Sequence, residues 1–311
     1  MLDENRVIES IDEKNGYKYL GQRFFPTNDV KTIVESNFKK RKIHIAKYYG
    51  WLNVNETTPI EIKLTVWDSC VMTSMLYASE CWGDISYLER ELLLVETKAL
   101  KAILKVKSGT TNDLVYWELQ RPTIMAKIKD AQYKFFQKVI QLSPNDAILA
   151  SVIQLCRDID FLKHYYELDG NACSTDMESR EQRIRESTNS MCRYYHNMNF
   201  QKKSCIYNSM TNDHYRYIIS RWRLSNHDLR IETGRYTKPI TPREERNCDT
   251  CNTIEDEHHV IFDCPKYDTV RNGHETILSC NAISTFLDCS YTNIRETASI
   301  LHEIERFRKE M

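Results

Sequence analysis

Three cysteines and one histidine near the C-terminal end restrict the fold of this chain more than any other feature of its sequence. They are Cys248, Cys251, His259 and Cys264, so that a Cys-x-x-Cys pair is followed after seven residues by the histidine and after four more by the last cysteine. Thiolates and imidazoles are the usual ligands of tetrahedral zinc, and Cys-x-x-Cys lets one tight turn offer two sulfurs to the same ion. The spacing therefore predicts a closed, structural zinc site.

The residues alone leave two points open. His258 stands next to His259 and could supply the nitrogen ligand in its place. The three cysteines could also be ordinary reduced thiols that hold no metal. If four protein side chains do bind zinc, no coordination position remains for a water molecule or a substrate. The motif therefore favours a structural site over hydrolytic zinc chemistry.

Length and composition fit a chain that folds around real hydrophobic cores. The 311 residues are 41% hydrophobic and 11% aromatic, which is enough for about two domains. Lysine and arginine together number 43 against 44 acidic residues, for a net charge of -1. The overall charge therefore does not select a partner, and only local clusters of charge can do so.

The cysteines and the hydropathy of the chain indicate its cellular compartment and whether it spans a membrane. The eleven cysteines are odd in number and irregularly spaced, and no charged-then-apolar signal segment stands at the N-terminus. This pattern favours an intracellular, reducing location in the cytoplasm, the nucleus or both, and a protein that is not secreted. Even the apolar stretch 60–82 is interrupted by Lys63, Asp68 and Glu80. We therefore expect no membrane span.

Sparse glycine and proline, with apolar residues at every third or fourth position, predict a mainly α-helical fold. Thr27 or Asn28 is a candidate cap for the first helix, and Thr58 for the second. Thr292 is a candidate cap for the last. Helices are expected over 27–49, 58–82, 85–103, 114–142, 146–168 and 292–307, and a strand is expected within 17–25.

A polar stretch at 169–178 predicts a linker, and the chain becomes locally basic after it. Cationic side chains neutralise phosphates, and aromatic rings stack on bases. Tyrosines and Trp222 are interleaved with the cations here. The alternative is a solvated helix face with the aromatic rings in the core. The candidate phosphate contacts are Arg216, Arg221, Arg223, Arg230 and Arg235.

Several segments along the chain carry recognisable patterns. They include Lys-Tyr-Leu-Gly at 18–21, Met-Leu-Tyr-Ala-Ser-Glu-Cys-Trp-Gly at 75–83, Leu-Val-Tyr-Trp-Glu-Leu-Gln-Arg at 114–121, parts of 226–246, and 256–265. In this order they resemble the region after the catalytic palm in reverse transcriptases of non-LTR retrotransposons, the LINE-like elements that include the jockey group. Ala78 and Gln120 stand where the family usually has glycine. The family places its histidine ligand directly before an apolar run, which favours His259 over His258.

The resemblance implies a division of the chain. Residues 1–26 would be a remnant of the palm/thumb junction, 27–168 a helical thumb-like region, 169–178 a linker, and 179–311 a basic helical domain with a zinc knuckle at 248–264. In the family a Tyr-x-Asp-Asp strand, which holds catalytic metal ions, should precede Lys18, and the seventeen residues before Lys18 lack it. We therefore expect the chain as given not to be an enzyme, although the family's activity is RNA-directed DNA polymerisation.

The expected function is that of a nucleic-acid-binding, zinc-stabilised C-terminal fragment of such a reverse transcriptase, with RNA, DNA or both as partners. Two alternatives stand beside it. In the first, the chain is a helical, zinc-containing module that has been adapted by its host to bind other proteins. In the second, it is a truncated gene model of an active RNA-directed DNA polymerase.

Overall fold

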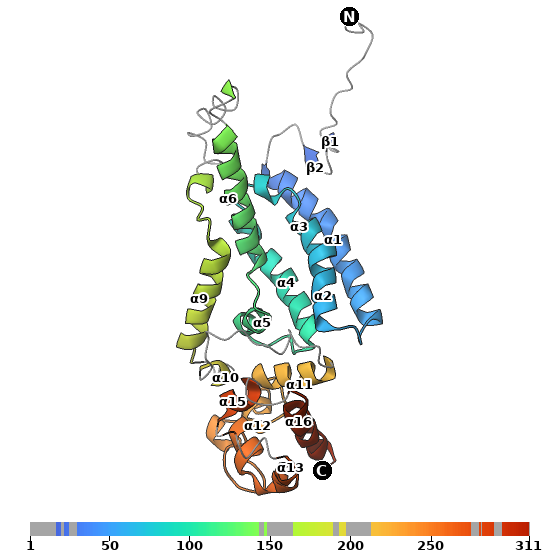
Figure 1. Ribbon diagram of the computed structural model, residues 1–311, viewed down its shortest axis with the longest axis vertical. Coiled ribbons are helices and arrows are strands. Elements are labelled where there is room, and N and C mark those ends of the chain that lie inside the picture. Colours follow the sequence, from blue (N-terminus) through green and yellow to red (C-terminus); the bar gives the residue numbers. More distant parts are fainter. Residues whose placement is uncertain are drawn as a thin grey trace, which may run out of the picture. The chain divides into compact units, whose positions relative to one another are not determined.

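The protein is mainly helical, as its sequence predicted (Figure 1). The computed structural model describes residues 17–19, 22–24, 30–142, 146–147, 164–188, 193–196, 213–274, 280, 282–288 and 294–310. Within these residues the only strands are β1 (Tyr17–Tyr19) and β2 (Gln22–Phe24), which pair antiparallel in the region where a strand was expected. No helix in the described stretches is long and apolar enough to cross a membrane.

The chain divides into two compact units, and each unit is built from separated stretches of sequence. The first comprises Met1–Glu56, Thr65–Leu93 and Ile124–Cys173, and the second comprises Thr57–Leu64, Leu94–Thr123 and Ser174–Met311. The sequence had instead suggested a simple division at a linker over 169–178. That expectation is wrong in one respect, because a helix begins at Ala172 and runs through most of the expected linker.

The helices of the first unit are α1 (Val30–Val54), η1 (Trp67–Met72), α3 (Thr73–Leu76), η2 (Ser79–Cys81), η3 (Ser86–Leu88) and α6 (Ile124–Leu142). Three helices contribute to both units, namely α2 (Ile60–Val66), α4 (Glu89–Leu104) and α9 (Ala172–Glu186). The second unit holds α5 (Asn112–Glu118), α10 (Arg193–His196), α11 (Asp213–Arg223), α12 (Arg230–Thr233), η7 (Arg243–Glu245), η8 (His259–Asp263), η9 (Pro265–Tyr267), α13 (Asp268–Asn272), α15 (Ile283–Asp288) and α16 (Ile294–Lys309). Most of the predicted helix 146–168, and the candidate caps Thr27, Asn28 and Thr292, lie outside the described residues.

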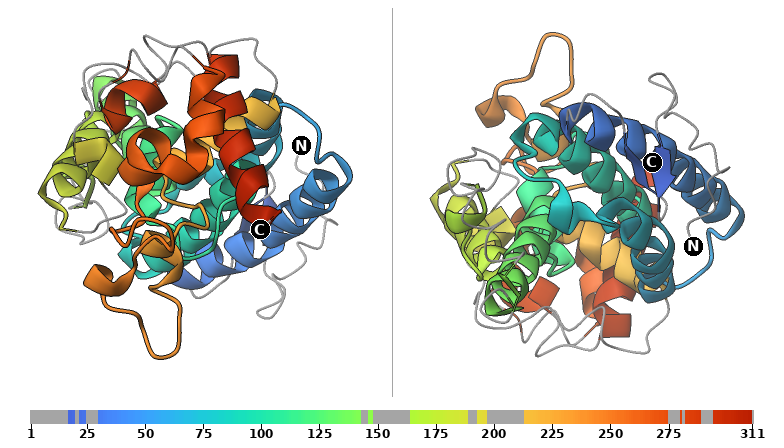
Figure 2. Two further views of the ribbon diagram at one scale, coloured as in Figure 1. Left: turned by 90° about the horizontal axis from the view of Figure 1, so that it is seen from below. Right: turned by 90° about the horizontal axis from the view of Figure 1, so that it is seen from above.

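In the first unit, α1 packs along η1 and α3 (Figures 1 and 2). Its buried face includes Val34, Phe38 and Tyr48, and the Tyr48 ring meets the Trp67 ring edge-on with 5.1 Å between centroids. Apolar area buried in this way is the main stabilising contribution to a helical core. Exposed positions of α1 are rich in lysine, including Lys39, Lys40 and Lys47.

A turn at 77–83 organises the rest of the first unit, because buried polar side chains bind its backbone. Gln132 of α6 donates hydrogen bonds to the carbonyls of Ser79 and Gly83, the latter at 2.8 Å. The Tyr165 hydroxyl donates to the Glu80 carbonyl at 2.7 Å, and burial raises the pKa of that hydroxyl to about 12. A buried carbonyl without a partner would be costly, so these side chains fix the path of the turn.

Left-handed backbone conformations end two helices that the sequence predicted to run further. The helix that starts at Ile60 continues through η1 and α3 but stops at Leu76, because Tyr77 leaves the helical region with a ψ of 123° and Ala78 follows with a φ of 58°. The predicted helix 114–142 is two helices, α5 and α6, separated at Gln120 with a φ of 51°. Side chains disfavour this conformation, which glycine adopts freely. Periodicity alone gave no signal for either break.

The second unit has a buried ionic network. Arg223 of α11 is completely buried, pairs with Glu118 at 3.3 Å and donates to the Leu287 carbonyl at 2.8 Å. The Tyr195 hydroxyl donates to the same carboxylate at 2.6 Å. Breaking a buried pair leaves an uncompensated charge, which costs about 3–5 kcal/mol. The network therefore holds α5, α10, α11 and α15 in register.

The C-terminal part of the second unit surrounds the predicted metal motif. Helix α16, which the sequence predicted over 292–307, packs against α11 and α13 and buries Ala298, Leu301 and Ile304. Figure 1 shows α13, which follows the motif, beside α16. The last helix of the chain is thus part of the support of the motif.

The left-handed conformation of Ala78 leads to a stability prediction. We expect Ala78→Gly to raise the free energy of unfolding by about 0.5–1 kcal/mol, because relief of the left-handed strain exceeds the entropy that glycine adds to the unfolded chain. Ala46→Gly, at an exposed position inside α1, should instead lower it by about 1 kcal/mol. Urea unfolding of both variants measures the difference, and equal destabilisation by the two would contradict the prediction.

Candidate metal centre

The first two cysteines of the motif lie in a short hairpin, residues 246–255, which we call the metal hairpin. Its two sides are joined by backbone hydrogen bonds, from Glu255 to the Arg246 carbonyl at 2.9 Å and from Cys248 to the Thr253 carbonyl at 2.7 Å. The turn closes through Asn252, which adopts a φ of 54°. Asparagine tolerates the left-handed region better than most residues do, so the sequence suits the reversal that places Cys248 and Cys251 side by side.

The close approach of Gly234 and Arg246 positions the base of the metal hairpin. A Cβ atom on Gly234 would lie 2.7 Å from the Arg246 Nε atom, so a larger residue would displace the arginine. The Arg246 guanidinium donates to the carbonyls of Ile231 and Thr241 at 2.8 and 2.9 Å. Arg246 therefore connects the metal hairpin to α12 and to the loop after it.

The histidine and the last cysteine come from one helical turn, η8. Asp256 begins this turn, because its carboxylate accepts a hydrogen bond from the His259 backbone at 3.0 Å. The Cys264 backbone donates to the His259 carbonyl at 2.7 Å, five residues back, which is a π-type turn. The wide turn brings Cys264 back to the same side as His259. The buried residues Val260 and Ile261 anchor the segment in the core.

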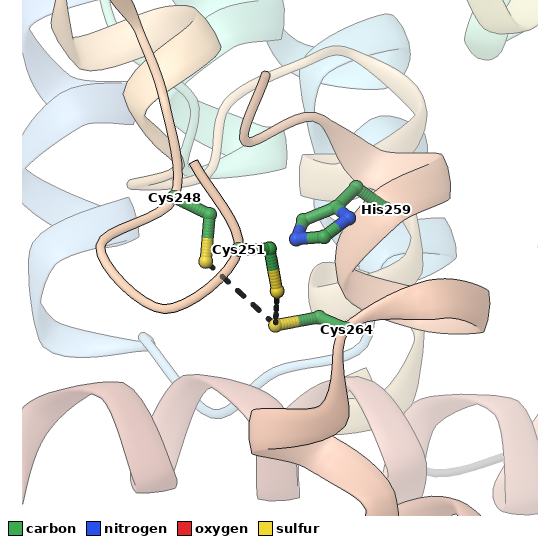
Figure 3. A group of neighbouring side chains, drawn as sticks. All are labelled: Cys248, Cys251, His259 and Cys264. Carbon is green, nitrogen blue, oxygen red and sulfur yellow. Dashed lines mark hydrogen bonds between the residues drawn. The ribbon is translucent and has the colours of Figure 1, made fainter. Parts of the chain in front are cut away.

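The four predicted ligands converge on one point, as Figure 3 shows. Their ligand atoms all lie within 4.8 Å of one another, and Cys264 Sγ is 3.7 Å from both Cys248 Sγ and Cys251 Sγ. Sulfurs bound to one tetrahedral ion at about 2.3 Å would lie about 3.8 Å apart. The four residues are therefore close enough to hold a metal ion, and their spacing fits tetrahedral coordination.

The imidazole of His259 is oriented as a ligand. Its Nε2 atom is buried without a hydrogen-bond partner, and its Nδ1 atom lies 3.3 Å from the Thr253 hydroxyl. A ligating histidine typically has its other ring nitrogen held by such a partner. His258 is instead exposed and bonds Asp263 at 3.0 Å. The geometry thus selects His259, the choice that the family resemblance favoured.

The environment of the thiols differs between the two buried cysteines. Burial alone would raise the pKa of Cys248, but hydrogen bonds from the backbone of Thr250 and Cys251 and from neighbouring side chains lower that pKa to about 7. Burial raises the pKa of Cys264, and the nearby sulfurs raise it further. Of these two thiols, Cys248 therefore loses its proton more readily, and cysteines bind a metal ion as thiolates.

Two of the five predicted phosphate contacts are buried, which corrects the sequence interpretation for them. The Arg216 side chain is 4% exposed and pairs with Glu61 of α2, while Arg223 belongs to the buried network around Glu118. A guanidinium that is already buried and paired does not meet a phosphate in solution. The aromatic residues next to them, Tyr194, Tyr195 and Trp222, are also core residues, and Tyr207 lies outside the described part of the chain.

The other three predicted contacts keep some exposure but also lie beside carboxylates. Arg221 is 3.3 Å from Glu305, Arg230 is 2.5 Å from Asp249, and Arg235 is 3.0 Å from Glu232. Their side chains are 29%, 45% and 23% exposed, so Arg230 is the most accessible of the set. A role for these three in phosphate binding stays a prediction.

Some residues that build the centre carried no signal in the sequence. Thr253 has no distinguishing pattern around it, and its role depends on which atoms the fold brings near it. Gly234 lies in one of the segments that resemble the family, but its close approach to Arg246 could not be predicted from that resemblance. Glu255 also belongs here, because it is 3% exposed and accepts hydrogen bonds from the Arg230 backbone and from Arg308 of α16. It therefore joins the metal hairpin to two helices.

No protein-family model, curated protein or solved structure matches this chain. The chemical capacity of the site therefore has to follow from the residues themselves. Three thiols and one imidazole form a complete ligand set for a soft or borderline metal ion, and they leave no coordination position for a substrate.

The hydrogen bond from Thr253 to the His259 ring gives a testable consequence. We expect Thr253→Val to lower zinc affinity by about tenfold, because the Nδ1 atom loses the partner that fixes the ring. Thr253→Ser, which keeps the hydroxyl, should retain most of the affinity. Competition with a chromophoric chelator measures both, and equal affinities for the two variants would show that the hydroxyl does not orient the ligand.

Proposed function

We propose that this protein binds nucleic acid through a helical scaffold whose C-terminal part is stabilised by a structural zinc ion. We further propose that it corresponds to the post-palm region of a non-LTR retrotransposon reverse transcriptase. The observation that carries the zinc part is the convergence of Cys248, Cys251, His259 and Cys264. Zinc suits this donor set best, since it takes thiolate and imidazole ligands in a tetrahedron.

The ion would act on folding, because its four ligands come from two short segments, the metal hairpin and η8, which it would join directly. The metal hairpin and η8 are short, and their sulfurs repel one another when more than one is charged. Binding free energy at a site that does not exist in the unfolded chain is largely folding free energy. No catalytic step is assigned to the ion, because the four side chains complete its coordination.

The backbone conformations of two residues also support the proposed family. Ala78 and Gln120 are the two positions where the resembling family usually has glycine, and both adopt left-handed conformations, with φ of 58° and 51°. Glycine is the residue that this conformation favours. The alignment of the two segments with the family therefore agrees with what the backbone requires at these positions.

The exposed face of α1 supports nucleic-acid binding. This helix carries five lysines and one arginine against one acidic residue, Glu35. Lys39, Lys40 and Lys47 are exposed along it, within about three turns. A row of lysines on one rigid helix suits a phosphate backbone, whose neutralisation releases counterions. Because the chain as a whole is close to neutral, this face is a local cluster and not a consequence of composition.

Metal analysis tests the zinc proposal. We expect one zinc ion per chain, and its removal by a chelator should lower the melting temperature by at least about 5 °C, because folding free energy is lost with the ion. Cys251→Ser should reduce zinc content in the same way, whereas Cys70→Ser, at an exposed cysteine outside the motif, should leave it unchanged. An unaltered melting temperature after complete zinc removal would exclude a structural role.

Salt-dependent binding tests the nucleic-acid proposal. Replacing Lys39, Lys40 and Lys47 by glutamine should weaken binding of single-stranded RNA or an RNA–DNA duplex and reduce the log-log salt slope by about 2. A control variant with glutamine at Lys98, Arg185 and Arg306 removes the same charge at exposed positions elsewhere. Equal losses in the two variants would indicate non-specific attraction, and binding that ignores ionic strength would overturn the proposal.

A further inference from the structure

A depression beside the metal hairpin gathers cationic side chains from three separate elements. Arg230 begins α12, Lys266 lies in η9 and Arg308 lies near the end of α16. Phe307 and Thr250 line the same depression. It is open to solvent and has a volume of about 620 Å³. We call it the hairpin depression.

The floor of the hairpin depression is a fixed ion pair. Glu255 is 4% exposed at its side chain and accepts two hydrogen bonds from the Arg308 guanidinium, one of them at 3.2 Å. Arg308 also donates to the Asp228 carbonyl at 3.0 Å. Burial alone would lower the pKa of Arg308, but its hydrogen bonds to Glu255 and Tyr267 raise that pKa. This pair is therefore a permanent part of the structure.

The rim of the hairpin depression is an exchangeable ion pair. Arg230 and Asp249 are 2.5 Å apart, yet their side chains are 45% and 69% exposed. An exposed pair of this kind contributes at most about 1 kcal/mol, so a stronger anion can replace Asp249 at low cost. Lys266 on the same rim packs over the Tyr267 ring at 5.8 Å and has no carboxylate within ion-pair distance among the described residues.

We propose that the hairpin depression binds the phosphate of a nucleotide, which displaces Asp249 from Arg230. A phosphate accepts two parallel hydrogen bonds from a guanidinium and a further one from an ammonium group, which Lys266 supplies. Phe307 provides an apolar aromatic surface for the base. This inference rests on the proposed nucleic-acid binding and deepens it, because it names one nucleotide unit and the residues that receive it.

Removal of the competing carboxylate is the sharpest test. Calorimetric titration with adenosine 5′-monophosphate should show saturable binding, and Asp249→Asn should tighten it roughly threefold because Arg230 is then unoccupied. Asp263→Asn removes the same charge from another exposed position next to a ligand cysteine, outside the hairpin depression, and should change affinity little. Equal gains in the two variants, or no saturable binding, would overturn the proposal.

Loss variants complete the test and separate the phosphate from the base. Lys266→Ala and Arg230→Gln should each weaken adenosine monophosphate binding roughly threefold, whereas Lys309→Ala, exposed on α16 and outside the hairpin depression, should not. Adenosine alone should fail to bind, and inorganic phosphate should bind more weakly than the nucleotide. If Phe307→Ala has no effect and inorganic phosphate binds as well as the nucleotide, the assignment to a nucleotide is wrong.

The variant with glutamine at Lys39, Lys40 and Lys47 distinguishes nucleotide binding in the hairpin depression from the RNA binding proposed for α1. It should retain adenosine monophosphate binding, since none of its residues lines the hairpin depression. If the wild-type protein binds adenosine monophosphate but does not bind RNA, the proposed function alone is refuted. Retained RNA binding in protein that fails to bind the nucleotide would refute the inference alone. Zinc content is measured in each variant so that an altered metal centre is recognised.

Discussion

The convergence of three sulfurs and one imidazole is the constraint on which the C-terminal part of the protein depends. Sulfur atoms held 3.7 Å apart in a buried position favour a cation between them, because thiolates repel and thiols make weak hydrogen bonds. The metal hairpin that presents two of them is tied through Glu255 to α12 and α16. Disturbance of the ligands should therefore spread to the last helix of the chain.

Buried charge is the second organising feature, and it changes how the basic region should be interpreted. Arg216 and Arg223 belong to ion pairs inside the second unit, with Glu61 and Glu118 as partners. Each partner comes from a distant part of the sequence, so the pairs link stretches that the chain order separates. Arginine serves well in this role because its guanidinium can satisfy several acceptors at once.

The segments that resemble the reverse transcriptase family act mainly as scaffold. The turn at 77–83 is held by Gln132 and Tyr165, and the segment at 116–121 supplies Glu118 to the buried network. A left-handed residue stands just beyond the end of a helix at both places. The residues of these two segments therefore fix a turn of the backbone and supply a partner for a buried charge. The surfaces proposed to meet nucleic acid, on α1 and in the hairpin depression, lie outside these two segments.

The sequence by itself determined the helical class and the four candidate metal ligands that the fold brings together, because each depends on local spacing or periodicity. It also favoured His259 through a resemblance, and the burial of that ring agrees. Only the tertiary structure decided that Arg216 and Arg223 are internal, that helices stop before Ala78 and Gln120, and that α9 covers most of the expected linker. Those outcomes depend on distant carboxylates, carbonyls and core contacts, which no local pattern contains.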